Sequence, residues 1–136
     1  MDKCVLLHVE DDDAAAFLFR SALDEAQIEV SVYRVSSSEE AIKFLRKTSP
    51  YERARRPRLI VLDVELPLED SWTLIAQVTR DPNLLSIPIV VLSIEPASEH
   101  ATRALDAGAQ AYIEKAFEFD AFVKQVKEAY SRSTHS

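Results

Sequence analysis

Five side chains that could do chemistry lie at or just beyond the ends of short apolar runs. They are Glu10 and Asp11 after "VLLHV", Asp63 at the end of "LIVLD", Ser93 at the end of "IPIVVLS", and Lys115 after "AYIE". Apolar runs of this length are typical of buried strands. Because parallel strands bring their carboxyl ends to one edge of a sheet, these side chains could share one site.

The chemistry of that set favours a phosphoryl group. Carboxylates from two strands repel each other, and a hard divalent cation such as Mg²⁺, bound through oxygen, relieves the repulsion. The cation and the Lys115 ammonium could then hold a phosphoryl group. In that setting Asp63 can act as a nucleophile toward phosphorus and form an aspartyl-phosphate. Ser93 offers a hydroxyl, and Lys115 a charge-assisted contact, to phosphoryl oxygens.

Strand and helix patterns alternate five times along the chain. Strands are expected over residues 5–9, 29–35, 58–62, 88–93 and 111–115. Helices are expected over residues 14–26, after the Ser-x-x-Glu pairs of 36–40, over 71–80, over 97–107 before Gly108, and over 119–130. This alternation predicts an α/β fold, in which helices cover both faces of a parallel sheet.

Length and composition restrict the number of domains, the kinds of partner and the cellular location of the protein. The 136 residues fit one domain, with a core of about 4–130 and a flexible tail at 131–136. A net charge of −7 argues against nucleic-acid and anionic-membrane partners. The single cysteine, Cys4, cannot form an internal disulfide. No apolar stretch of about 20 residues and no signal peptide is present, so a cytoplasmic protein is expected.

The segments "HVEDD", "LIVLDVELP", "IPIVVLS" and "GAQAYIEKAF", in that order, resemble the receiver domain of two-component response regulators. The resemblance runs from Val5 to about Tyr130. It implies a flavodoxin-like (βα)5, doubly wound sheet in the order 2-1-3-4-5, with Asp63 accepting phosphate from a histidine kinase. It also implies roles for further residues: Asp11 as a direct Mg²⁺ ligand, Glu10 acting largely through water, the Glu65 backbone carbonyl as a ligand, and Ser93 with Tyr112 as the switch pair.

The same resemblance implies a signalling switch that phosphorylates and dephosphorylates itself, not a turnover enzyme. Residues 48–57, "RPRLIVLDVELP" and "RDPNLLSIPIVVLS" look most like the small stand-alone regulators paired with phytochrome-type kinases. A homodimer could form through the fourth helix, fifth strand and fifth helix, as in that family. The sequence does not identify the cognate kinase, its stimulus or the downstream target.

Several residues depart from the family pattern or have a plainer interpretation. Ala116 stands where proline with a cis bond is usual, and a non-proline cis bond costs about 2.5–4 kcal/mol. Ile94 replaces a small residue, and Glu65 adds negative charge beside the phosphorylation site. His8 is expected to be a partly buried structural histidine, and Tyr112 could be plain packing.

Two alternative functions stay open from the sequence. One is a pseudo-receiver, a binding module that keeps the fold without being phosphorylated, which Ala116, Ile94 and Glu65 would allow. The other is a Toprim-like phosphodiester enzyme, with Glu10 as acid/base and Asp63 and Glu65 as the metal pair. The second fold should carry a glycine beside its first glutamate and basic residues for nucleic acid, and this sequence has neither.

Overall fold

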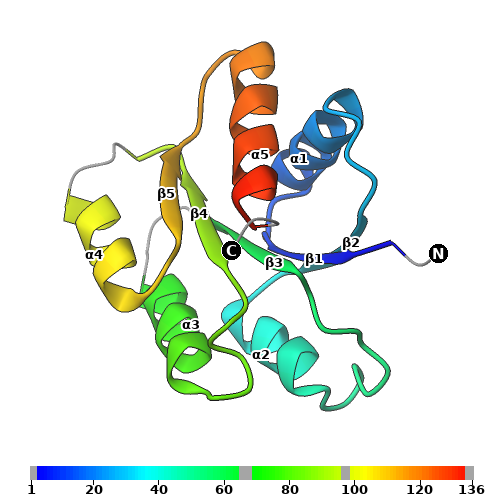
Figure 1. Ribbon diagram of the computed structural model, residues 1–136, viewed down its shortest axis with the longest axis vertical. Helices are drawn as coiled ribbons and strands as arrows, with labels where there is room; N and C mark the ends of the chain where they lie inside the picture. Colours follow the sequence, from blue (N-terminus) through cyan, green and yellow to red (C-terminus); the bar gives the residue numbers. More distant parts are fainter. Residues whose placement is uncertain (1–2, 65–68, 96–98, 134–136) are drawn as a thin grey trace.

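A computed structural model describes residues 3–64, 69–95 and 99–133. Five parallel strands form one sheet in the order β2-β1-β3-β4-β5 (Figure 1). The strands are β1 (Val5–Val9), β2 (Ser31–Val35), β3 (Leu59–Val64), β4 (Ile89–Ser93) and β5 (Ala111–Glu114). The strand order reverses at β1, whose two neighbours are β2 and β3, and this is where sheets of this kind bind ligands. The predicted sheet order is confirmed.

Helices cover both faces of the sheet. The helices are α1 (Asp13–Glu25), α2 (Ser38–Arg46), α3 (Glu69–Arg80), α4 (Glu99–Ala107) and α5 (Phe119–Ser133). In Figure 1, α1 and α5 lie on one side of the sheet, and α2, α3 and α4 lie on the other. The predicted doubly wound architecture is therefore confirmed.

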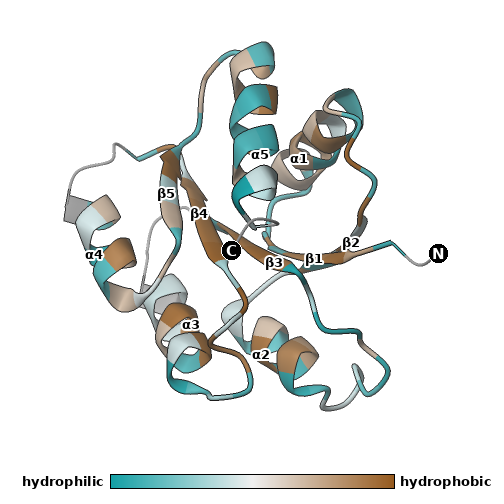
Figure 2. Cartoon of the chain, viewed as in Figure 1, coloured by the Kyte–Doolittle hydropathy of each residue, from teal (hydrophilic) through white to brown (hydrophobic). Residues whose placement is uncertain are grey.

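Two apolar layers hold these helices against the sheet. On the α1/α5 side, Phe19, Leu23, Phe122 and Val126 pack against the strands. On the other side, the layer contains Phe44 and Leu45 of α2 with Leu74, Ile75 and Val78 of α3. Every residue of β1 and β4 is buried, which matches the apolar strands in the centre of Figure 2. Because both faces of the central strands β1 and β4 are covered, polar side chains on these strands can reach solvent only at the strand ends.

Local signals fix several element boundaries. The Asp12 side chain caps α1 by accepting a hydrogen bond from the Ala15 N–H at 2.8 Å. Ser37 caps α2 by accepting from the Glu40 N–H at 3.1 Å, which selects the second of the two overlapping Ser-x-x-Glu pairs. Gly108 has a φ of 116°, and a Cβ there would overlap the Thr79 side chain. The predicted glycine cap after α4 is confirmed.

The structure differs from the predicted boundaries at two places that matter. The third strand runs to Val64, beyond the expected end at residue 62, because Asp63 pairs with Leu92 and Val64 pairs with Ser93 in the β3–β4 ladder. Residues 131–133, expected to be a flexible tail, continue α5, and Ser133 is buried. Among the described residues, none of the helices has the length and apolar character needed to cross a membrane.

Candidate phosphorylation and metal site

Three of the predicted site residues meet at the carboxyl edge of β3, β4 and β5. Asp63 is buried near the end of β3, and its Oδ1 forms an ion pair with the Lys115 ammonium. Ser93, fully buried at the end of β4, accepts the Lys115 backbone N–H at 2.7 Å through its own carbonyl. The strand ends therefore bring the Asp63 carboxylate to the Lys115 ammonium, and Ser93 lies beside them on β4, opposite Val64 in the β3–β4 ladder.

The acidic pair at the end of β1 is divided between the interior and the surface. Glu10 is 1% exposed, and its Oε2 accepts a hydrogen bond from the Asp12 N–H at 3.0 Å. Asp11 is exposed, and its carboxylate is outside the compact group of ligand atoms that Glu10 and Asp63 form. The structure thus brings Glu10 to Asp63 and leaves Asp11 at the rim. The remaining predicted ligand, the Glu65 carbonyl, lies outside the described residues.

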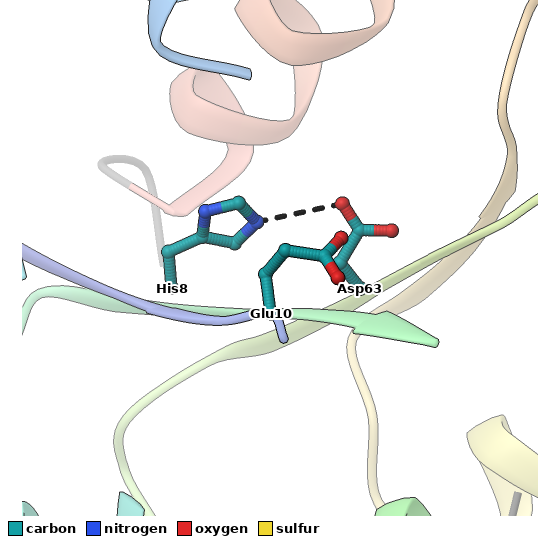
Figure 3. Close-up of side chains that lie close together, drawn as sticks. All are labelled: His8, Glu10 and Asp63. Carbon is teal, nitrogen blue, oxygen red and sulfur yellow. Dashed lines mark ion pairs between the residues drawn. The ribbon is translucent and has the colours of Figure 1, made fainter. Parts of the chain in front are cut away.

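His8 is a site residue whose contact with Asp63 the sequence did not reveal. Its side chain is fully buried, and its Nε2 lies 3.4 Å from Asp63 Oδ2 (Figure 3). The ring packs against Phe19 of α1, with 4.3 Å between ring centroids. Since His8 pairs with Val61 across β1 and β3, residue 63 is two positions further along on the same face of the sheet. That register was the signal that sequence reasoning alone could not supply.

The surroundings shift the pKa values of Glu10 and Asp63 in opposite directions. Burial raises the pKa of Glu10 to about 8, and the neighbouring Asp63 carboxylate reinforces the shift. Burial also acts to raise the pKa of Asp63, but the neighbouring His8 and Glu10 side chains and the Lys115 ammonium outweigh it, so that this pKa is lowered. Without a cation at neutral pH, Asp63 is ionised and Glu10 is protonated.

The buried polar atoms of this cluster fit a divalent cation. Among the described residues, Glu10 Oε1, both Asp63 carboxylate oxygens and both His8 ring nitrogens are buried without a hydrogen bond of good geometry. Asp63 Oδ1 has the Lys115 ammonium as an ion-pair partner, so Glu10 Oε1, Asp63 Oδ2 and the His8 nitrogens are the atoms left for a ligand. One ligand atom from each of the three residues lies within 4.8 Å of the others. Buried unpaired oxygens are costly, and a cation compensates for that cost. The donor set therefore suits a bound metal ion.

The Lys115–Ala116 peptide bond is trans; among the described residues, the cis bond is Ser49–Pro50. The Ala116 N–H, which proline would lack, donates to Gln125 Oε1 at 2.9 Å, and Gln125 Nε2 donates to the Glu114 carbonyl at 2.8 Å. Gln125 on α5 thereby clamps both ends of the short segment that carries Lys115. Of the two backbone geometries that the sequence left open, the chain adopts the trans bond.

The predicted switch residues Ser93 and Tyr112 meet at the backbone of Glu95. Ser93 Oγ accepts the Glu95 N–H at 3.0 Å, and the Tyr112 hydroxyl donates to the Glu95 carbonyl at 3.2 Å. Tyr112 is partly buried against the α2/α3/α4 side of the core. Ile94, between Ser93 and Glu95, is 60% exposed. The two side chains are therefore connected through one residue of the β4–α4 loop.

Arg34 is a second residue of the site edge that sequence reasoning missed. Its Nε donates to the Glu10 carbonyl at 2.8 Å, and its guanidinium pairs with the Asp13 carboxylate at 2.7 Å. A guanidinium in this position joins the end of β2 to the loop that carries the acidic pair. The alternation of residues 29–35 had placed Arg34 on a strand face without indicating this contact.

The fold and the site together define the class of protein. The family model for the response regulator receiver domain matches residues 6–127, and the chain belongs to this family. This match confirms the resemblance that the strand-end motifs carried.

Two cyanobacterial regulators illustrate the relationship. The chain is 28% identical over 123 residues to the response regulator Rcp1 of Synechocystis, covering 90% of this chain and 84% of Rcp1. The crystal structure of Mn²⁺-bound Rcp1 superposes with a TM-score of 0.82, covering 96% of this chain and 93% of that one. The structure of the phosphorylated cyanobacterial phytochrome response regulator RcpA is 30% identical in sequence and superposes with a TM-score of 0.86. The match covers 98% of this chain and 96% of the RcpA chain.

Proposed function

We propose that this receiver domain is a phosphorylation switch in which Asp63 accepts a phosphoryl group from a histidine kinase in a Mg²⁺-dependent reaction. The observation that supports this most directly is the state of Asp63. The carboxylate is buried at the sheet edge, and its pKa is lowered by the neighbouring His8 and Glu10 side chains and by the Lys115 ammonium, which together outweigh the effect of burial. A carboxylate kept ionised in a largely desolvated place is suited to nucleophilic attack.

In the proposed reaction an Asp63 oxygen attacks phosphorus, and the bond from phosphorus to the kinase imidazole nitrogen breaks. The product is an acyl phosphate. Lys115, which now pairs with Asp63, would transfer its contact to a phosphoryl oxygen, and the Ser93 hydroxyl would donate to another. Asp11, Asp63 and the Glu65 carbonyl would hold Mg²⁺ with Glu10 nearby, and the ion would neutralise the charge of the phosphoryl group.

Phosphorylation would reach the surface through Glu95. If the Ser93 hydroxyl turns toward the phosphoryl group, the Glu95 N–H loses its present acceptor. The Glu95 carbonyl is held by Tyr112, so a shift of this residue would move the Tyr112 ring as well. The switch then alters the β4–α4 loop and the outer face of β5, and a partner protein that binds there would detect the change.

The proposed partners follow from the comparisons and from the exposed surface. RcpA is a phytochrome response regulator, and a phytochrome-type histidine kinase is accordingly the proposed phosphodonor. A homodimer through α4, β5 and α5 is the second proposed contact; Leu105 and Phe119 are exposed at 48% and 37% on these helices. Analytical ultracentrifugation of wild type and Leu105→Glu tests it, and a monomer at all concentrations, phosphorylated or not, contradicts it.

The function is tested by intact-protein mass spectrometry after incubation with acetyl phosphate. One phosphoryl group should be incorporated with Mg²⁺ and none after Mg²⁺ is chelated. Asp63→Asn should abolish incorporation, whereas Asp106→Asn, which removes an exposed carboxylate from α4, should not. A wild-type protein that is not modified under any of these conditions would instead be a pseudo-receiver, a phosphorylation-independent binding module.

A further inference from the structure

We propose that His8, Glu10 and Asp63 form a binding site for a first-row transition-metal dication, such as Mn²⁺ or Zn²⁺, which this chain binds in preference to Mg²⁺. The inference rests on the proposed function in one respect, since both place a cation beside Asp63. It goes further by giving the cation a nitrogen ligand.

The position of the imidazole carries this inference. His8 Nε2 lies 3.4 Å from Asp63 Oδ2, which is long for a hydrogen bond, and neither ring nitrogen makes a hydrogen bond of good geometry among the described residues. Two ligands that each lie about 2.1 Å from one ion are about 3.0–3.4 Å apart at octahedral to tetrahedral angles. The separation of these two atoms is therefore one that a shared ion would produce.

Each of the three residues retains one atom for the ion. Asp63 Oδ1 is taken by Lys115, which leaves Oδ2. Glu10 Oε2 accepts the Asp12 N–H, which leaves Oε1. Figure 3 shows the His8 ring and the two carboxylates pointing toward one another from neighbouring strands. The result is one imidazole nitrogen and two carboxylate oxygens, all from side chains that are 8% exposed or less.

The donor types decide which cation is preferred. Mg²⁺ takes oxygen ligands and retains several waters, whereas imidazole nitrogen suits transition metals. The site is also held rigidly, because the His8 ring packs on Phe19 and lies within β1. Both cations would use Asp63, so we expect Mn²⁺ or Zn²⁺ bound through His8 to compete with the Mg²⁺ that phosphorylation requires.

The test is the affinity of the unphosphorylated protein for Mn²⁺, Zn²⁺ and Mg²⁺, measured by isothermal titration calorimetry. His8→Leu should weaken Mn²⁺ and Zn²⁺ binding by about tenfold or more, with a change of less than about twofold for Mg²⁺. The matched control replaces the other two histidines, His100 and His135, with glutamine and should leave all three affinities unchanged. Equal selectivity in wild type and His8→Leu would overturn the inference.

A second measurement keeps His8 and the rest of the buried site unchanged. In wild-type protein with Co²⁺ bound, an imidazole ligand gives a strongly shifted, solvent-exchangeable N–H signal in the proton NMR spectrum. Selective ¹⁵N labelling of histidine, with His100→Gln/His135→Gln as the background, assigns that signal to His8. Absence of the signal from Co²⁺-saturated protein also overturns the inference. Mg²⁺-dependent phosphorylation is measured separately, so that failure of either idea is recognised independently of the other.

Discussion

The raised pKa of Glu10 predicts that the metal-free protein loses stability as pH rises toward neutrality. The folded state holds the Glu10 proton up to a pKa of about 8, whereas the unfolded chain releases it near 4.5. The contribution of this group is therefore fully present below pH 4.5 and is lost as pH rises through the interval to about 8. At about 1.4 kcal/mol per pH unit, the loss between pH 4.5 and 7 is about 3 kcal/mol.

Glu10→Gln isolates this effect because the introduced amide keeps the size of the side chain but does not ionise. The amide can accept the Asp12 N–H and donate to Asp63, so the local contacts can be retained. In EDTA at pH 7, we expect Glu10→Gln to be more stable than wild type by up to about 3 kcal/mol. The difference should shrink toward zero near pH 4.5.

The assay is urea denaturation followed by circular dichroism between pH 4.5 and 8. Glu128→Gln, which removes an exposed carboxylate from α5, serves as the matched control. With saturating Mg²⁺, wild type should recover stability, and more so at pH 8 than at pH 6, because the cation displaces the proton. Glu10→Gln should gain less. A difference between wild type and Glu10→Gln that stays constant across the pH range would refute the reasoning.

Three further substitutions test contacts around the site. Gln125→Ala removes both hydrogen bonds that clamp the Lys115 segment. It should lower the free energy of unfolding, measured by urea denaturation, by about 1–2 kcal/mol and should slow phosphate incorporation. The control variant Gln110→Ala should leave the rate of incorporation unchanged. Arg34→Met removes the bond to the Glu10 carbonyl and should cost about 1.5–3 kcal/mol; a loss of only a few tenths would show that this contact contributes nothing. Tyr112→Phe should cost about 0.5–1.5 kcal/mol and leave phosphate incorporation intact while changing the response of the β4–α4 loop amide signals in NMR; an identical response would exclude Tyr112 from the switch.

The order of elements was readable from the sequence because burial on both faces makes a strand of this sheet a short apolar run. Val5–Val9 and Ile89–Ser93 are such runs, and both are buried throughout. Gly108 was equally clear, since its positive φ and the nearby Thr79 side chain leave room for glycine alone. The end of β3 was less clear, because only pairing with β4 extends that strand through the polar Asp63.

The sequence by itself determined which chemistry-bearing residues follow the strands: Asp63, Ser93 and Lys115 meet because parallel strands share one carboxyl edge. Only the tertiary structure decided what surrounds them. The contacts of His8 with Asp63 and of Arg34 with Glu10 depend on the register between strands, and the clamp by Gln125 depends on how α5 packs. Spacing along one segment carries no information on such contacts between elements, since register and packing are set by the sheet as a whole.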